Sequence, residues 1–318
     1  LVLAVLRVQL GPFQFCLSAT APLGAASLGN DISLEALTGS RVDLDRHDID
    51  LDTREVVRHL RRMLLASLNS ESVLCPYRAY YFTSNVHFAC SETAELLGLF
   101  KERQIPFEHK PWVESNLRAE GVRTIPWRYF AEERRHHLAN LLDKGPIVLR
   151  ASRSSGGTGV ALARTPEQID SRWEPSPDSL IAVAPFLQDA TPINVGACVF
   201  PDGTVTVHPG SYQLIGLPEC TNRDFGYCGN DISLFKQLPD EIVDQVDEMT
   251  RTVGRWMGRM GYVGAFGLDC LVQGDDVYFS EVNPRFQGST ALSTAACAEA
   301  GLPDVLLDHL AAFLGVDP

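Results

Sequence analysis

The stretch AFGLDCLVQGDDVYFSEVNP, from Ala265 to Pro284, restricts the fold of this 318-residue chain more than any other segment. Two largely apolar runs flank Gly274-Asp275-Asp276, which predicts two strands joined by a tight turn. Successive side chains on a strand point to opposite faces, so Glu281 and Asn283 share one face. If the strands pair about the turn, Asp269 on the first strand lies beside them. The segment therefore predicts a β-hairpin that carries three oxygen-bearing side chains on one patch.

The chemistry of this patch favours a bound cation with an anion next to it. Carboxylate and amide oxygens suit a hard divalent ion, and Mg²⁺ is usually held by a few carboxylates together with nucleotide phosphates. Arg285 follows the proline directly, and its guanidinium suits a phosphate or a carboxylate. Acidic residues near a hairpin often serve only solubility, which explains the aspartates of the turn but not the alternating Glu281 and Asn283. We therefore interpret the patch as a candidate cation site.

A glycine-rich loop follows a short apolar strand in IVLRASRSSGGTGVAL. Arg150 ends the strand, and Gly156, Gly157 and Gly159 follow among small polar residues. Glycines let the backbone approach phosphate oxygens and turn its N–H groups towards them. Such loops are often only flexible connectors, and this one is neither a Walker loop nor a GxGxxG fingerprint. The loop alone therefore leaves two readings open, a phosphate-binding lid and a linker.

Apolar periodicity predicts the other elements of the chain. A long amphipathic helix is expected over 239–261, with its apolar stripe in the core. Further helices are expected over 52–68, 91–105 and 109–120, with Gly121 ending the last. Strands are expected within 72–85, 145–151 and 178–187, and a hairpin over 193–210 closed at Asp202-Gly203. The hexapeptide GNDISL occurs at Gly29–Leu34 and Gly229–Leu234, where Gly-Asn-Asp is typical of a turn.

Composition excludes several classes of protein. The formal net charge of −13 argues against nucleic acid or an anionic membrane as the main partner. It does not exclude a small anion, because local cations and backbone N–H groups bind phosphates whatever the global charge. No apolar run reaches the ~18–20 residues of a membrane helix. The composition is therefore that of an ordinary globular protein, for which a small anionic ligand stays possible.

Cysteine spacing and the N-terminus bear on the compartment. None of the eight cysteines forms a C-x-x-C pair, which favours ordinary buried thiols in a reducing, cytoplasmic environment. The opening LVLAVLRVQL is compatible with a buried strand or with the apolar part of a signal peptide. Arg7 interrupts the run and no basic lead precedes it, so we favour the strand.

Together these stretches resemble the ATP-grasp superfamily of carboxylate ligases, in the order of that family. HKPWVESNLRAEGV matches its lysine, helix and Gly-Val ending, IVLRASRSSGGTGV its strand and lid, IAVAPFL its adenine hinge, and GYVGAFGLDCLV…VYFSEVNPRFQGST its metal-binding core. The resemblance implies an α/β (α+β) ATP-grasp fold. It also implies a pre-ATP-grasp domain over 1–108, a nucleotide-binding lobe with the lid over 109–200, and a lobe with the metal-binding core over 201–318.

The resemblance implies ATP and Mg²⁺ as cofactors, with Mn²⁺ as an alternative ion, and it assigns roles to individual residues. The metal ligands are Asp269, Glu281 and Asn283. The nucleotide is bound through its phosphates by Lys110 and Arg150, through the lid by Ser152, Ser155, Gly156, Gly157 and Gly159, and elsewhere by Val183, Ala184, Phe186 and Asn194. The catalytic residues are Arg285 and Arg150, and the substrate is bound by Arg285, Gly288, Ser289 and Thr290. Apart from the resemblance, Arg223 and Tyr227 of the loop Gly216–Asp231 are candidates for substrate contact and equally plausible as ordinary loop residues.

Three positions depart from the family pattern. Arg150 stands where a lysine is usual, which keeps the charge but replaces a point ammonium with a planar fork. Ala184 stands where the hinge often carries an acid. Asn194 stands where a later acid often meets the ribose or a lysine. These changes concern the details of nucleotide contact rather than the fold.

The function implied is that of an ADP-forming ligase. Such an enzyme activates a carboxylate as an acyl phosphate and couples it to an amine, here an amino acid or a peptide. Three alternatives stay open: an ATP-grasp kinase, a nucleotide-binding module without turnover, and a biotin-dependent carboxylase. The expected partners are a small-molecule carboxylate and an amine, without nucleic acid or membrane, and the family is compatible with a homodimer.

Overall fold

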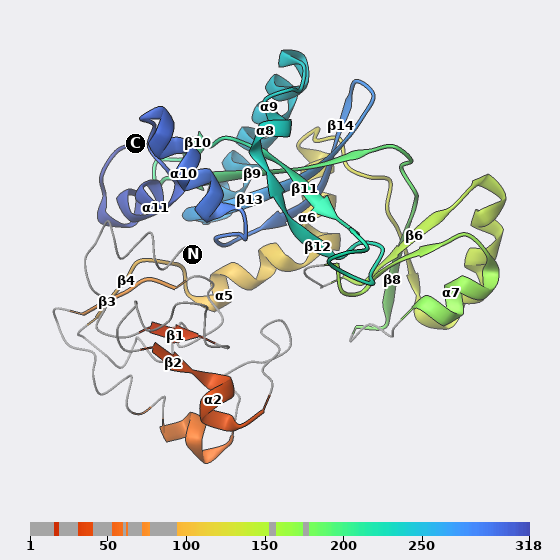
Figure 1. Cartoon of the computed structure of the whole chain (residues 1–318), viewed down its shortest axis with the longest axis horizontal. Helices are drawn as coiled ribbons and strands as arrows, with labels where there is room; N and C mark the ends of the chain where they lie inside the picture. The colour runs from red at the N-terminus through yellow and green to blue at the C-terminus, as the bar shows by residue number, and fades with distance from the viewer. Residues whose placement is uncertain are drawn as a thin grey trace.

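Figure 1 shows the computed structural model of the chain, coloured from the N-terminus to the C-terminus. It describes residues 16–18, 31–40, 53–59, 62, 72–76, 94–152, 157–173 and 178–318. The opening LVLAVLRVQL and most of the helix expected over 52–68 lie outside these residues, although 55–59 are helical. No helix of the described part has the length and apolarity needed to cross a membrane.

The described N-terminal elements pair as parallel strands, which is typical of an α/β unit. β1 (Cys16–Ser18) pairs with β2 (Asp31–Ser33), and β3 (Ser72–Leu74) pairs with β4 (Ala94–Leu96). Helix α2 (Leu34–Thr38) follows β2 directly and ends at Gly39. The strand expected within 72–85 is thus confirmed at β3.

The helix expected over 91–105 is wrong in its first half. β4 occupies Ala94–Leu96, and helix begins only with α5 (Lys101–Gln104) and the 3-10 turn η2 (Ile105–Glu108). Pairing with β3 and a close approach of the chain at Gly98 override the local helical pattern. A Cβ at Gly98 would lie 2.8 Å from Pro76 Cγ, so the backbone passes where a larger residue would not fit.

A four-stranded antiparallel sheet forms the smaller lobe. Its spatial order is β5 (Arg128–Ala131), β8 (Leu180–Pro185), β6 (Ile147–Arg150) and β7 (Val160–Ala163). The 3-10 helix η3 (Glu132–Lys144) and helix α7 (Pro166–Arg172) pack against it. Leu149 and Ile181 of the sheet and Leu138 of η3 are completely buried in this core. Both strands expected here, over 145–151 and 178–187, are confirmed.

A six-stranded antiparallel sheet forms the larger lobe. The order is β12 (Tyr227–Asp231), β11 (Ser211–Ile215), β9 (Thr191–Val199), β13 (Gly264–Gln273) and β14 (Asp276–Asn283), with β10 (Val205–Val207) paired to β9. The two expected hairpins, β9–β10 and β13–β14, are confirmed. The chain changes sheet between β8 and β9, whereas the predicted lobe boundary at residue 200 lies after β9.

Helices cover the two faces of the larger sheet (Figure 1). On one face lie α9 (Asp240–Arg259) and α6 (Lys110–Ala119), whose Met257 and Leu117 are packed with Phe266 and Phe279 of the sheet. On the other lie α10 (Thr290–Ala300) and α11 (Val305–Leu314). The expected helix over 239–261 is confirmed, except that Met260 ends it and is 50% exposed. Gly121, with φ +81°, follows α6 as expected.

Both copies of GNDISL join a strand to a short helix. In the first copy Ser33 caps α2, and in the second Asp231 ends β12 and caps α8 (Ile232–Phe235). The second copy is therefore a strand end with a capped helix, not the expected turn.

Candidate active site

The register of the larger sheet brings three polar side chains into one row. Asn194 of β9 lies opposite Asp269 of β13, which lies opposite Glu281 of β14. Asn283 is two residues further along β14, on the same face. The three oxygen donors expected from the sequence thus lie together on one patch, and Asn194 lies next to them.

Asp269 is held by three carboxamides. Its Oδ1 accepts hydrogen bonds from Asn194 Nδ2 at 2.5 Å and from Gln213 Nε2 at 3.1 Å, and its Oδ2 accepts one from Asn283 Nδ2 at 3.0 Å. Removal from water, and after it the charge of the facing Glu281 carboxylate, raise the pKa of Asp269 to about 6 against the lowering effect of the hydrogen bonds from Asn194 and Asn283. The two carboxylates therefore repel each other across neighbouring strands.

This repulsion and the donor chemistry fit a divalent cation. An ion between Asp269 and Glu281 would offset their mutual repulsion, and oxygen donors suit Mg²⁺ or Mn²⁺. Across the described ranges, no three side chains of His, Cys, Asp or Glu gather as for an all-protein metal site. The remaining ligands would have to be amide and phosphate oxygens, the arrangement typical of nucleotide-bound Mg²⁺.

Lys110 faces the same patch from helix α6. It is the first residue of the helix, its side chain is buried, and Nζ lies 3.2 Å from Glu281 Oε2. Glu114, one turn later on α6, is only 1% exposed. Lys110 and Glu114 line a small pocket together with Ser280 and Glu281 of β14. A buried ammonium beside the candidate cation site is suitably placed for phosphate oxygens.

Arg150 is surrounded by other side chains. Its guanidinium lies 3.9 Å from the centre of the Trp127 ring and forms an ion pair with Glu114. It also donates to Tyr129 Oη, and through Nη1 to the Ser280 carbonyl, each at 3.4 Å. Tyr129 in turn donates to Glu114, and burial followed by the charge of Glu114 raises the pKa of Tyr129. The residue expected to bind phosphate thus uses both Nη1 and Nη2 within the protein, while its buried Nε has no hydrogen-bond partner among the described residues.

The lid residues that the structure describes pack closely on a neighbouring loop. Gly157 and Gly159 have φ of +77° and +66°, which favours glycine. A Cβ at Gly157 would lie 1.9 Å from the carbonyl oxygen of Phe225. The buried Ser152 donates its hydroxyl to Asp178. Two further predicted lid residues, Ser155 and Gly156, lie outside the described residues.

Two of the three expected hinge side chains are in the hydrophobic core. Val183 packs with the core of the smaller sheet, and Ala184 lies in the cluster between the two lobes. Phe186, just after β8, packs edge-on against Phe225 at 6.5 Å and donates its N–H to Pro146. The side chains of Val183 and Ala184 are therefore core residues, so the hinge contact that the resemblance implies would be made by their backbone.

Most residues expected to bind substrate lie beside the row. Gly288 approaches Tyr227 so closely that a Cβ there would lie 2.9 Å from Tyr227 Oη. Ser289 donates its hydroxyl to Asn194 Oδ1 at 2.5 Å, and Thr290 begins helix α10. Arg223, in contrast, is exposed in the loop before β12 and is not brought to the row by any contact shown.

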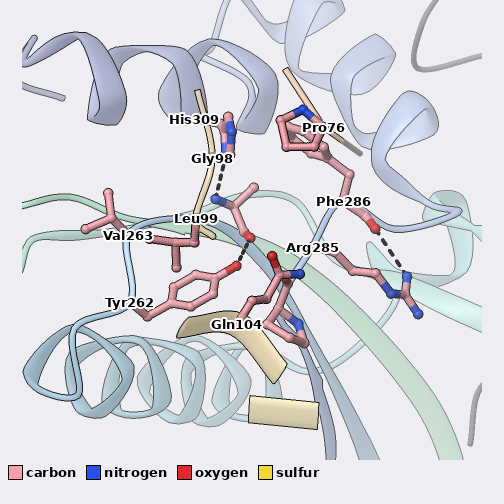
Figure 2. A pocket seen from close by; sticks show the side chains of 11 residues that line it. Pro76, Gly98, Leu99, Gln104, Tyr262, Val263, Arg285, Phe286 and His309 are labelled. Carbon is pink, nitrogen blue, oxygen red and sulfur yellow. Dashed lines mark hydrogen bonds between the residues drawn. The ribbon is translucent and has the colours of Figure 1, made fainter. Parts of the chain in front are cut away.

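Arg285 is tied to the row and to a second pocket. Nη2 donates to Asn283 Oδ1 at 3.0 Å and Nη1 to the Phe286 carbonyl at 3.2 Å. Figure 2 shows Arg285, Gln104 and Tyr262 around this pocket, with His309 bonded to Ala265 at its far side. The buried Gln104 donates to the carbonyl of Pro284, the residue between Asn283 and Arg285. The Asn-Pro-Arg element is therefore supported from α5.

Sequence reasoning missed several residues of the site. Gln213, Glu114 and Gln104 each contact a predicted residue or its neighbour. Glu114 had a usable signal, because it lies four residues after Lys110 and so on the same helix face. Gln213 alternates with Ser211 on its strand, but a polar residue on an exposed strand face is too common to single out.

Comparison with known proteins identifies the family of the chain. A family profile described as "ATP-grasp domain" matches residues 124–289, more than half of the chain. The formate-dependent phosphoribosylglycinamide formyltransferase of Nitratidesulfovibrio vulgaris strain DP4 is 29% identical over 178 residues, covering 52% of this chain and 40% of that protein. The enzyme of the same name from Salmonella schwarzengrund is 24% identical over 318 residues, covering 92% and 75%. The chain thus spans well under half of the first of these relatives.

Solved structures agree on the fold. The biotin carboxylase domain of the Hydrogenobacter thermophilus 2-oxoglutarate carboxylase, in complex with MgADP, ADP and bicarbonate, matches with a TM-score of 0.68 at 14% identity. It covers all of this chain, which spans 67% of that one. The carboxyaminoimidazole ribonucleotide synthase of Aspergillus clavatus, complexed with ATP, also matches at 0.68, with 15% identity and coverage of 100% and 74%. Family profile and fold agree, and the chain belongs to the ATP-grasp family.

Proposed function

We propose that this chain is an ATP-dependent carboxylate–amine ligase that forms an acyl phosphate and releases ADP and phosphate. The observation that carries the proposal is the row on the larger sheet. Two facing carboxylates, Asp269 and Glu281, lie beside Asn283, with the buried Lys110 on one side and Arg285 on the other. Few functions other than binding a metal–nucleotide complex require carboxylates and cations interleaved in this way.

The nucleotide would lie between the two lobes, with its phosphates at Lys110. Mg²⁺, or Mn²⁺ in its place, would be held by Asp269, Glu281 and Asn283, and when bound it neutralises charge on the phosphates. Lys110 then exchanges its contact with Glu281 for a phosphate oxygen. This exchange keeps the buried ammonium paired in both states, so its charge is never left alone in the interior.

The substrate carboxylate would lie at Arg285 and the first turn of α10. That turn contains no acidic side chain, and the hydroxyl of Ser289 is directed to Asn194 instead of capping the helix. Backbone N–H groups at a helix N-terminus attract anions. Gly288, Ser289 and Thr290 thus form one side of a carboxylate site, and the guanidinium of Arg285 forms the other.

The reaction then follows from positioning and charge. The substrate carboxylate oxygen attacks the γ-phosphorus, the bond to the β-phosphate oxygen breaks, and ADP leaves. The amine attacks the acyl carbon of the mixed anhydride, loses a proton, and displaces phosphate to leave an amide. Arg285 stabilises negative charge on the acyl phosphate and on the tetrahedral intermediate.

The lid would protect the acyl phosphate from water. Gly157 packs on the backbone of Phe225, and Arg172 of α7 pairs with Asp224 at 2.5 Å. The loop before β12 therefore adjoins the lid and also leads to Tyr227, next to the carboxylate site. We propose amino acids or peptides as the amine, and a homodimer as the assembly; the relatives' names, which include a formyltransferase and carboxylases, support chemistry at small carboxylic acids.

The test is a screen for ADP release with ATP, Mg²⁺ and pairs of a carboxylic acid and an amino acid. Release that requires both partners, with a condensed product by mass spectrometry, is the expected result. Glu281→Gln provides the inactive control. A phosphorylated product without condensation would replace the ligase with a kinase, and nucleotide binding without any ADP release would replace it with a binding module.

A further inference from the structure

The surroundings of Arg150 do not resemble those of a phosphate ligand. The residue is 4% exposed, and its guanidinium stacks on Trp127 while its Nη2 pairs with the 1%-exposed Glu114. The buried carboxylate of Glu114 already compensates the charge of the buried Arg150 guanidinium. Breaking such a pair to serve another anion would leave Glu114 uncompensated, which is strongly unfavourable.

The same contacts explain why arginine is present where the family usually has lysine. A planar guanidinium can stack on an indole ring and offer a fork of donors in the same position, whereas an ammonium on a flexible stem cannot do both. Arg150 uses its fork for Glu114, for Tyr129 and for the Ser280 carbonyl. The substitution is therefore coupled to its neighbours Trp127, Tyr129 and Glu114.

These contacts reach both sides of the candidate active site. Ser280 lies at the β-bulge where the pairing of β13 and β14 shifts, and it directly precedes Glu281. Glu114 lies one helical turn from Lys110 on α6. Arg150 thus connects the backbone next to Glu281 with the helix that carries Lys110, and those two side chains meet at 3.2 Å.

We infer that Arg150 is a positioning residue, which fixes Lys110 relative to Glu281 through Glu114 and the Ser280 carbonyl and does not contact the nucleotide phosphates. This inference rests on the proposed function only in taking Lys110 and Glu281 as the phosphate and metal contacts. It revises the role expected for Arg150 from the sequence, and it makes Glu114 part of the nucleotide site without contact to the nucleotide.

The test is calorimetric titration with a non-hydrolysable ATP analogue across a series of Mg²⁺ concentrations, on Arg150→Lys, Glu114→Gln and the double variant. We expect each single variant to weaken analogue binding about tenfold and to raise the Mg²⁺ concentration required. We expect the double variant to be little worse than either single one, because the two residues act as a unit. The Mg²⁺ requirement is a readout that simple loss of stability would not change.

A phosphate ligand would behave differently. Arg150→Lys would then keep affinity within about twofold, and Glu114→Gln, which releases the guanidinium, would leave affinity unchanged or raise it. Either result, or additive losses in the double variant, overturns the inference. Arg135→Lys, in the exposed pair with Asp170, is the matched control and should bind like wild type.

Two further measurements keep the test decisive. If Arg150→Lys does not fold by thermal melting, Tyr129→Phe removes a single hydroxyl from the cluster. We expect it to weaken analogue binding about threefold and raise the Mg²⁺ requirement, and wild-type values would overturn the inference. Failure of the wild-type protein to bind the analogue would contradict the proposed function itself, which distinguishes the two failures.

Discussion

The two sheets contribute to the candidate active site by different means. In the larger sheet, backbone register alone puts Asn194, Asp269 and Glu281 in a row. The smaller sheet acts through a long side chain, because Arg150 at the end of β6 reaches to α6 and to β14. Backbone register positions residues that a local sequence pattern already identifies. The role of a long side chain such as that of Arg150 depends instead on neighbours that are distant in sequence. We therefore expect substitutions in the row of the larger sheet to change catalysis directly. We expect substitutions of long side chains that contact distant segments to change the position of site residues or the stability of the fold.

The largest effect is expected within the row. Glu281→Gln keeps the shape of the side chain but removes the charge that faces both Lys110 and the cation. We expect ADP release to fall at least about a thousandfold, equivalent to roughly 4 kcal/mol of transition-state stabilisation, with the thermal melting temperature little changed. Steady-state ADP release checks this. Asp275→Asn in the exposed hairpin turn is the control, and equal losses in both variants would break the comparison.

A substitution of His309 tests the contribution of a buried α11 side chain that forms hydrogen bonds with two segments distant in sequence. Nδ1 accepts from the Ala265 N–H at 2.9 Å and Nε2 donates to the Leu97 carbonyl at 3.0 Å (Figure 2 shows the first bond). Burial lowers the pKa of His309 to about 4, against the opposing effect of the Leu97 bond. The imidazole of His309 binds a proton more readily in the unfolded chain than in the folded one. Its contribution to the free energy of unfolding is therefore fully present above pH 6.5. It falls by up to about 3 kcal/mol as the pH drops from 6.5 to 4.

Urea unfolding at several pH values measures this loss. His309→Gln should reduce stability at neutral pH but flatten the dependence between pH 6.5 and 4. His137→Gln, on the exposed surface of η3, should leave the dependence as in wild type. An unchanged slope in His309→Gln would show that the imidazole is not the group responsible.

A substitution of Gln104 tests whether a shift of the Asn-Pro-Arg element, without any change of its own residues, affects activity. Its carboxamide is buried and donates to the Pro284 carbonyl. Gln104→Leu leaves that carbonyl without its donor, so we expect a loss of about 1–3 kcal/mol in unfolding free energy. Misplacement of Arg285 should also lower kcat by about tenfold with little change in the KM for ATP. A wild-type kcat in a folded variant would contradict this role.

The smallest effect is expected at the surface of the larger lobe. Arg123 pairs with Asp276 at the start of β14, and both side chains are about half exposed. Exposed ion pairs contribute little, so Arg123→Ala should change stability by less than about 1 kcal/mol and leave ADP release unaltered. A larger loss, measured by chemical unfolding at low and high salt, would show that this contact contributes more than its exposure suggests.

The features that were predictable from the sequence are local, and those that were not depend on long-range contacts. The alternation around Glu281 and the turn at Gly274 predicted the hairpin and its donor patch, because strand periodicity and turn chemistry are local. The helix expected over 91–105 was wrong in its first half, since pairing with β3 is a long-range interaction. The surroundings of Arg150 and the Gln104 bond were not predictable either. They depend on side chains that meet only once both lobes have folded.

The most direct measurement is a crystal structure of the protein with Mg²⁺ and a non-hydrolysable ATP analogue. We predict Mg²⁺ at about 2.1 Å from carboxylate oxygens of Asp269 and Glu281, in contact with the phosphates, with Lys110 on a phosphate and Arg150 still stacked on Trp127. A triphosphate bound away from the row, with both carboxylates directed elsewhere, would contradict the account.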